Sequence, residues 1–328
     1  SNDDGYFMAD RWRLQSGGST PARYNLIQEG NSGLAGLTKA HLVDCTTASA
    51  SPGADDYVVL SQRIEGYNCQ QMEFGHSTAK PVTLSFWAKG TAGTYLVELY
   101  DNANTQAACQ QFTVTTSWQR FTATFPARTS GTIACSTAAG MEVNFFLHAG
   151  SNFTGGTYAA NTWRTYTNAN RAVGISNGGA GVMQSTSHEF FFTGVQLEVG
   201  SNATPFEHRS YADELARCQR YFYRVDVINT NPVMPMQRYY QGSGGGYGQW
   251  SFPVPMRTQA HTYVVSAANS WNGPGAGYIG RPVSRTVGDY NSCTFHSDYT
   301  NISANQTAFA AAVNPSSYPC YFTFDTEL

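Results

Sequence analysis

Hydrophobic and polar residues alternate with a period of two along most of the first 200 residues. Strict alternation predicts β-strands, because successive side chains of a strand point to opposite faces of its sheet. Segments of this kind, bounded by Gly, Pro, Asn and Ser, span residues 24–28, 57–64, 82–88, 95–100, 119–125, 141–148 and 189–199. Short strands at this spacing predict an all-β fold, an antiparallel jelly roll or β-sandwich.

The alternation fades between residues 150 and 180 into a long polar segment with scattered aromatic residues. Loops of this length in compact domains generally carry function or form interfaces. Trp163, Arg164 and Tyr166 are therefore candidate loop or interface residues, and Trp250 and Trp271 are further candidates of the same kind.

One helix is predicted over residues 210–223. Ser210 and Asp213 form a capping box, and apolar residues follow at helical spacing. We expect three parts: a jelly roll over 1–205, a linker and helix over 206–223, and a smaller β-sandwich over 224–328. Strands of the last part are expected at 224–229, 249–253, 262–266, 290–299 and 318–324.

The glycine-rich run at 242–248 predicts a flexible or close-packing turn. It does not predict a phosphate-binding loop, because no Gly-Lys-Ser/Thr follows and no α/β unit surrounds it.

Composition narrows the function classes. Charged residues make up 12 % of the chain, aromatic residues 14 %, and the net charge is −3. These values argue against a disordered chain, a coiled coil and electrostatic binding of nucleic acid. No apolar stretch approaches 18 residues and no signal peptide is visible, so we expect a soluble chain that does not insert into a membrane. A polar but uncharged surface suits neutral sugars or close neighbours in an assembly.

Cofactor chemistry has little support in the sequence. The seven cysteines contain no CxxC pair, and no histidine lies at metal-ligand spacing from them, which argues against a zinc or redox site. Their scatter predicts mostly free, buried thiols in a chain that folds in a reducing cytoplasm. The alternative is one or two disulfides among Cys45, Cys69, Cys109 and Cys135. Acidic residues that could ligate a structural Ca²⁺ are Asp3, Asp4, Asp10, Asp55 and Asp56. We interpret these aspartates as solvated turn residues, so no cofactor is predicted.

The pleat sorts the strand residues by face. The apolar positions of segments 82–88, 95–100, 119–125 and 141–148 form the core face. The opposite face then carries the glycan-binding candidates Trp87, Tyr100, Trp118, Arg120, Glu142, Asn144 and His148. Aromatic rings stack on pyranose rings while polar side chains bind hydroxyls. The alternative is that the N-terminal strand, the long loop or a neighbouring subunit covers this face, with Trp87 and Trp118 as packing residues.

Glu98 and Glu142 could be the paired carboxylates of a glycosidase. Outward acids on a sheet are more often solvated or paired with arginine. No GxSxG nucleophile elbow or HExxH motif occurs either. We therefore predict no catalytic residue and no enzyme activity.

Three stretches, VTLSFWAKG, TYLVELYDN and SWQRFTATF, resemble jelly-roll carbohydrate-binding modules. MADRWRL, RIEGYNCQQMEFGHSTAKPVTLSFWAKG and above all FFFTGVQLEVGSNATPFEHRSYADELARCQRYFYR resemble tailed-bacteriophage virion proteins of the tail-fibre or head-fibre type. The resemblance covers residues 6 to about 224. The matching positions of the strand-and-helix junction and the helix are Val195, Leu197, 205–211, Leu215, Cys218 and Tyr221, and none of them is a catalytic or ligand residue in the family.

The resemblance implies a bacteriophage virion protein, in the first instance a tail-fibre or spike component that binds host surface glycans during adsorption. The alternatives are a capsid decoration (head fibre or cement) or a tail adaptor with a structural role, and less readily a polysaccharide depolymerase. The partners implied are two further copies in a homotrimer, other virion proteins and a host glycan. The protein would be assembled into the virion in the host cytoplasm.

Overall fold

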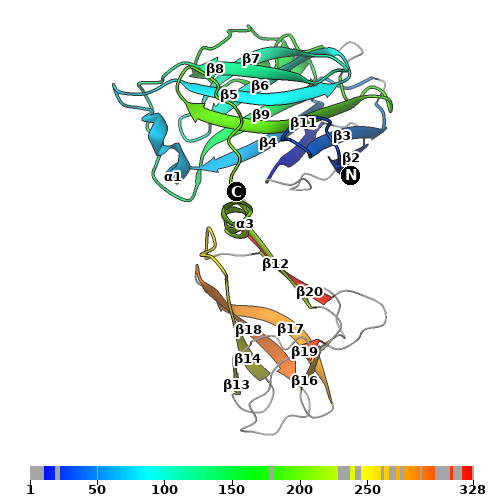
Figure 1. Ribbon diagram of the computed structural model, residues 1–328, viewed down its shortest axis with the longest axis vertical. Coiled ribbons are helices and arrows are strands. Elements are labelled where there is room, and N and C mark those ends of the chain that lie inside the picture. Colours follow the sequence, from blue (N-terminus) through cyan, green and yellow to red (C-terminus); the bar gives the residue numbers. More distant parts are fainter. Residues whose placement is uncertain are drawn as a thin grey trace. The chain divides into compact units, whose positions relative to one another are not determined.

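Figure 1 shows the computed structural model, in which the chain divides into two units, residues 1–208 and 209–327. The structure describes residues 11–18, 23–49, 51–176, 181–227, 237–240, 245–259, 262–265, 271–273, 277–288, 290–299, 311–312 and 320–326. Each unit is described by itself.

The first unit is a sandwich of two antiparallel sheets, which confirms the predicted fold class (Figure 1). Sheet A has the strand order β1 (Arg13–Gly17), β4 (Tyr57–Glu65), β9 (Ala139–Ala149), β6 (Gly93–Asp101), β7 (Gln106–Val114), β10 (Arg164–Thr165). Sheet B has the order β2 (Arg23–Glu29), β3 (Ala40–Thr47), β11 (Glu189–Val199), β5 (Val82–Gly90), β8 (Gln119–Phe125). Short helical turns are α1 (Gly66–Cys69), η1 (Gln70–Met72), α2 (Ser151–Thr154) and η2 (Asn168–Asn170).

The seven predicted strands of this unit all form, whereas β1, β3, β7 and β10 were not predicted. In β3, the four consecutive residues from Ala40 to Val43 are all buried, so the strand shows no alternation. In β7, the run from Ala107 to Cys109 is likewise buried on both faces. In both strands apolar residues stand at consecutive positions, Leu42 and Val43 in β3 and Ala107 to Cys109 in β7, and such runs lose the period-two signal that identifies a strand in a sequence.

The core between the sheets is aromatic. The predicted core positions Val82, Leu84 and Phe86 of β5 are fully buried. Phe86 meets Phe145 of β9 edge to face, with ring centroids 4.8 Å apart and planes at 78°. Such pairs add about 0.5–1.5 kcal/mol to the stabilisation from burial alone. The two sheets are therefore joined by rings from strands far apart in the sequence.

A bulge in β11 explains the GVQLE motif. The register between β11 and β5 shifts between Thr193 and Gln196, and Gly194 has a positive φ of 58°. Phe190 and Phe192 join the core before the bulge, and the apolar residues after it occupy odd positions (Val195, Leu197 and Val199). One inserted residue reverses which positions face inward, so the bulge keeps apolar residues on the core along the whole strand.

The bulge also turns two polar side chains outward to hold the chain that leaves the sandwich. Gln196 accepts a hydrogen bond from the backbone N–H of Glu207 at 2.7 Å. Glu198 accepts one from the backbone N–H of Thr204 at 3.1 Å. We call Gln196, Glu198 and the segment 204–207 the exit clasp. The run GVQLE…TPFEH is thus a structural motif in which a strand fixes the segment that follows it.

The second unit begins with α3 (Tyr211–Gln219). The hydroxyl of Ser210 accepts a hydrogen bond from the backbone N–H of Asp213 at 3.2 Å, which confirms the predicted cap. The helix ends at Gln219 and not at residue 223, because β12 (Phe222–Val227) pairs with β20 (Cys320–Asp325). The carbonyl of Tyr221 accepts from the backbone N–H of Thr326 at 2.8 Å. A long-range ladder therefore overrides the local helical pattern.

Two sheets follow. One has the order β12-β20-β15, with β15 at Thr262–Val265. The other has the order β13 (Gln237–Tyr240), β14 (Gly245–Ser251), β18 (Ser292–Tyr299), β17 (Gly277–Gly288), β16 (Trp271–Gly273), β19 (Ala311–Ala312). Five of these strands overlap predicted segments, and β13, β16, β17 and β19 were not predicted. The glycine-rich run was expected to be a turn, but its residues 245–248 are strand and pair with β18. None of the described helices is long and apolar enough to span a membrane.

His148, one of the glycan-binding candidates, is buried near the end of β9 with 1 % of its surface exposed. Its ring lies against Gly181, where an added Cβ would come within 2.4 Å of Nδ1. Among the described residues, neither ring nitrogen has a hydrogen-bond partner. Burial lowers the pKa of His148 from 6.5 to about 4, although the charge of Asp56 opposes this shift. His148 is therefore a core residue that no ligand on the sheet surface can contact.

This burial predicts an acid-sensitive fold. The unfolded histidine takes up a proton below pH 6.5 and the folded one only below about pH 4, so stability falls as the pH falls through that window. From about pH 7.5 to about pH 4.5, His148 alone should cost the wild type about 2 kcal/mol of unfolding free energy. Urea unfolding of the wild type and of His148→Leu at both pH values measures the difference. An identical loss in both proteins would contradict the prediction.

Candidate functional site

The seven candidates that the pleat placed on one face belong to two different sheets. Trp87, Trp118 and Arg120 lie on or beside β5 and β8 of sheet B. Tyr100, Glu142, Asn144 and His148 lie on β6 and β9 of sheet A. Because the two sheets turn their outer faces to opposite sides of the sandwich, these residues do not form one surface. Alternation assigns a residue to the inside or outside of its strand but says nothing about which sheet the strand joins.

Segments of the same chain cover part of the outer face of sheet B, although Arg120 on that face stays exposed. The indole N–H of Trp118 donates to the carbonyl of Ser32 at 2.7 Å, and the ammonium of Lys89 lies 5.2 Å from its ring centroid. Arg120 donates to Ser85 Oγ at 3.1 Å and to the carbonyl of Thr204 in the exit clasp.

Trp87 lies on the same covered face. A Cβ added at Gly194 would come within 3.3 Å of the Trp87 ring and 2.8 Å of Leu37, so all three pack closely. The interpretation of Trp87 and Trp118 as packing residues fits this arrangement. The cover is the chain's own segments around residues 32–37 and 200–208.

The long loop covers part of the outer face of sheet A. Phe153, Tyr158 and Ile175 of the loop pack on Leu96 and Phe146 of the sheet, forming a small apolar cluster outside the main core. The loop candidate Trp163 is also a packing residue. Its ring meets Phe74 edge to face at 5.5 Å, and its N–H donates to the carbonyl of Pro126 at 2.7 Å.

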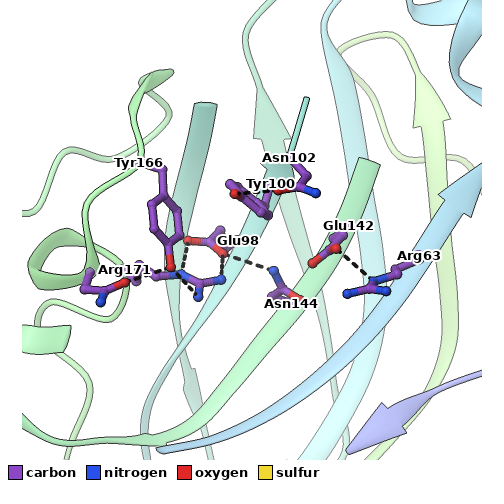
Figure 2. A network of polar contacts seen from close by, with 9 residues as sticks. Arg63, Glu98, Tyr100, Asn102, Glu142, Asn144, Tyr166 and Arg171 are labelled. Atoms are coloured by element: carbon purple, nitrogen blue, oxygen red, sulfur yellow. Dashed lines mark hydrogen bonds and ion pairs between the residues drawn. The ribbon is translucent and has the colours of Figure 1, made fainter. Parts of the chain in front are cut away.

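A buried ion pair fastens this loop to the sheet (Figure 2). Glu98 of β6 is 1 % exposed and accepts two hydrogen bonds from the Arg171 guanidinium, at 2.6 and 3.2 Å. Asn144 of β9 donates to the same carboxylate at 3.0 Å. Burial alone would lower the pKa of Arg171, but the charge and hydrogen bonds of Glu98 outweigh it and raise that pKa. Arg171 therefore keeps its charge, and its hydrogen bonds to Glu98 hold it in a fixed geometry.

Beside this pair lies a row of aromatic and charged side chains. Arg63 of β4, Glu142 of β9 and Tyr100 of β6 are register partners across the sheet, and Arg63 Nε is 2.9 Å from Glu142 Oε1. Tyr166 of the loop lies next to Tyr100, with ring centroids 4.9 Å apart and planes at 41°. Figure 2 shows both tyrosines together with the two ion pairs. We call Tyr100, Tyr166 and these two pairs the tyrosine site.

Each ring of the tyrosine site is oriented from several sides. The Tyr100 hydroxyl donates to Asn102 at 3.0 Å, and the Tyr166 hydroxyl donates to Asn168 at 2.8 Å. The guanidinium carbon of Arg171 lies 4.8 Å from the Tyr166 centroid and 5.6 Å from that of Tyr100, within the range of cation–π attraction. Both tyrosines remain half-buried, so their free surface faces the solvent at a fixed angle.

The two acids considered as a glycosidase pair are both bonded to arginine, Glu98 to Arg171 and Glu142 to Arg63. Pairing with arginine is the arrangement expected more often for outward acids on a sheet than a catalytic pair. The depolymerase hypothesis gains no support from the described residues, and the lack of enzyme activity stays a prediction.

The acidic residues considered for Ca²⁺ do not gather in the described part of the chain. Asp55 accepts a hydrogen bond from Asn152, and Asp56 accepts one from the backbone N–H of Gly53 at 2.7 Å. Within the described ranges, no group of three or more His, Cys, Asp or Glu is placed to hold a metal ion. Asp3, Asp4 and Asp10 lie outside these ranges. Trp250 and Trp271 lie on β14 and β16, but the structure describes only the backbone there.

Sequence reasoning missed Arg63 and Arg171. Arg63 could have been found by sorting the faces of segment 57–64, which places Ser61 and Arg63 outward when Val58 and Leu60 face the core. Arg171 gave no such signal, because a loop residue has no periodicity that tells which surface it will reach.

No protein-family model and no curated protein matches this chain. Solved structures that it resembles are carbohydrate-binding modules with a jelly-roll fold. The structure described as "CBM4 structure and function" is 15 % identical over 58 % of this chain and 87 % of that one, with a TM-score of 0.32. The family 11 module of the cellulase Lic26A-Cel5E of Clostridium thermocellum is 13 % identical over 64 % and 99 %, with a TM-score of 0.31. The N-terminal cellulose-binding domain of Cellulomonas fimi β-1,4-glucanase C is 18 % identical over 55 % and 91 %, with a TM-score of 0.28.

Removing one member of the buried pair should be far more damaging than removing both. Arg171→Met leaves the Glu98 carboxylate buried and uncompensated, which should cost about 3 kcal/mol of unfolding free energy. The double change Arg171→Met with Glu98→Met should recover most of that loss. Denaturant unfolding of the three proteins measures this.

Lys80→Met is the matched control, because it breaks an exposed ion pair with Glu73 in the same unit. It should leave the unfolding midpoint unchanged. A single Arg171→Met change as mild as this control would show that the pair does not hold the loop.

Proposed function

We propose that the first unit binds glycans at the tyrosine site. The observation that carries this proposal is the pair Tyr100 and Tyr166, whose ring centroids lie 4.9 Å apart beside fixed arginine and carboxylate groups on a partly open sheet face. Flat aromatic rings stack on the apolar faces of pyranoses, and charged or amide groups at their edge bind hydroxyls.

The rigidity of the site supports the same proposal. Each ring is held by a hydrogen bond from its hydroxyl and by the Arg171 guanidinium, and the ion pair of Arg63 with Glu142 is fixed by strand register. A ligand that binds groups already held in place loses less side-chain entropy than one that must order them. Weakly binding sugars gain most from such preorganisation.

For the biological setting, we propose a bacteriophage virion in which the chain is a tail-fibre or spike component that attaches to host surface glycans. The support is the resemblance of the run GVQLE…TPFEHRSY to virion proteins and a surface that is polar with little charge. A homotrimer and contacts with other virion proteins belong to this proposal. The alternative is a capsid decoration or tail adaptor, in which the same faces pack against neighbouring proteins.

Tyr166→Ala should weaken binding to host-surface glycans by about ten-fold or more, because it removes one face of the stacking site. Tyr166→Phe keeps the ring and should retain most of the affinity. Trp118→Ala is the matched control, since its ring lies beside sheet B, on the opposite side of the sandwich from the tyrosine site, and donates to Ser32. Binding of the labelled full chain to a glycan array and to host cells measures all three. Loss of binding in Trp118→Ala but not in Tyr166→Ala would overturn the proposed site.

Labelling of intact virions with an antibody against this chain tests the setting. Label at the tail tip is expected for a receptor-binding fibre, together with a three-copy mass of the purified protein by light scattering. Label on the capsid surface would favour decoration instead. Virions that contain no copy of the chain would overturn both.

A further inference from the structure

A small pocket adjoins the tyrosine site where the long loop meets sheet A. Its lining includes Glu98, Cys109, Arg164, Tyr166, Asn170 and Arg171. It therefore shares Tyr166 and Arg171 with the tyrosine site, so a sugar stacked on Tyr166 would lie within reach of the other pocket residues.

The charges in this pocket do not cancel. Arg171 is paired with Glu98, but the guanidinium of Arg164 donates only to neutral acceptors. These are the carbonyls of Thr157 and Asn170, the latter at 3.1 Å, and the sulfur of Cys109 at 3.9 Å. Among the described residues no carboxylate lies within ion-pair distance of Arg164, so the pocket carries two cations and one anion.

A half-buried cation without a counter-charge is an unfavourable arrangement for a protein alone. An anion bound beside Arg164 would compensate it. Guanidinium groups present a planar set of N–H donors that matches a carboxylate, and such charge-assisted hydrogen bonds are about twice as strong as neutral ones. Thr165 and Thr167 also line the pocket, and hydroxyl side chains suit a sugar.

We propose that the ligand of the tyrosine site is an acidic glycan, with a uronate-type carboxylate bound by Arg164 while the sugar ring stacks on Tyr166. This rests on the proposed glycan-binding function and goes beyond it by naming the class of sugar. The overall charge of −3 gives no long-range attraction for an acidic polymer, so the preference must come from this local cation.

Arg164 also ties the loop together through Thr157 and Asn170. If Arg164 has a purely structural role, its replacement should weaken binding of acidic and neutral sugars equally. If it binds an anion, its replacement should weaken binding of the acidic sugars alone. The test must therefore compare two sugars that differ in the carboxylate alone.

NMR titration of the full chain with D-glucuronate and D-galacturonate, each against its uncharged counterpart D-glucose or D-galactose, makes this comparison. The wild type should bind the acidic sugars about ten-fold more tightly. Arg164→Met should remove this preference and keep the affinity for the neutral sugars, and Arg164→Lys should keep part of it. Raising NaCl from about 50 to about 500 mM should weaken binding of the acidic sugars only.

Equal affinity of the wild type for acidic and neutral sugars would overturn the acidic-glycan inference and leave the proposed glycan site intact. A loss of both kinds of sugar in Arg164→Met would assign Arg164 to loop structure and likewise overturn the inference. If none of the four sugars perturbs the resonances of Tyr100 or Tyr166 and the glycan array is also blank, both proposals fail together.

Discussion

The ion pair between Glu98 and Arg171 determines what the outer face of sheet A can do. A carboxylate at a buried strand position needs a cation, and Arg171 supplies it from a loop more than 70 residues away in sequence. By meeting this need, the loop brings Tyr166 beside Tyr100, and Arg164 joins Tyr166 in the lining of the adjoining pocket. The guanidinium of Arg171 pairs with Glu98 and also lies over the Tyr166 ring. One side chain therefore both neutralises the buried carboxylate and orients a ring of the tyrosine site.

Both outer faces of the sandwich are covered by the chain itself, but with different consequences. On sheet B, the exit clasp and the segment around Ser32 engage Arg120 and Trp118, which leaves the most conspicuous aromatic residues of the sequence as packing residues. On sheet A, the loop covers one end of the face with an apolar cluster and leaves its edge lined by polar and aromatic groups. Both covers are partial: on sheet B the chain's own segments hold the aromatic rings, and on sheet A two tyrosine rings lie together beside the loop.

Local patterns predicted the fold well, because strand segments such as 119–125 alternate cleanly and the helix cap at Ser210 is a short-range signal. They failed where the information is long-range. Strands β3 and β7 carry apolar residues at consecutive positions and show no alternation. The assignment of Trp87 and Tyr100 to one face failed because nothing in a strand's own sequence states which sheet it joins. The end of α3 was overestimated because pairing of β12 with β20 competes with helical spacing.

The charge of the whole chain and the charge at the pocket lead to different expectations about the ligand. The composition argues for neutral ligands, since few residues are charged and the net charge is small. Two ion pairs, Glu98 with Arg171 and Glu142 with Arg63, nevertheless lie on neighbouring strands of sheet A, where their charges cancel. Against that balanced background, a single additional arginine decides the sign of the pocket. Arg164 lines the pocket without a carboxylate partner among the described ion pairs, so the proposed preference for an acidic sugar depends on this residue.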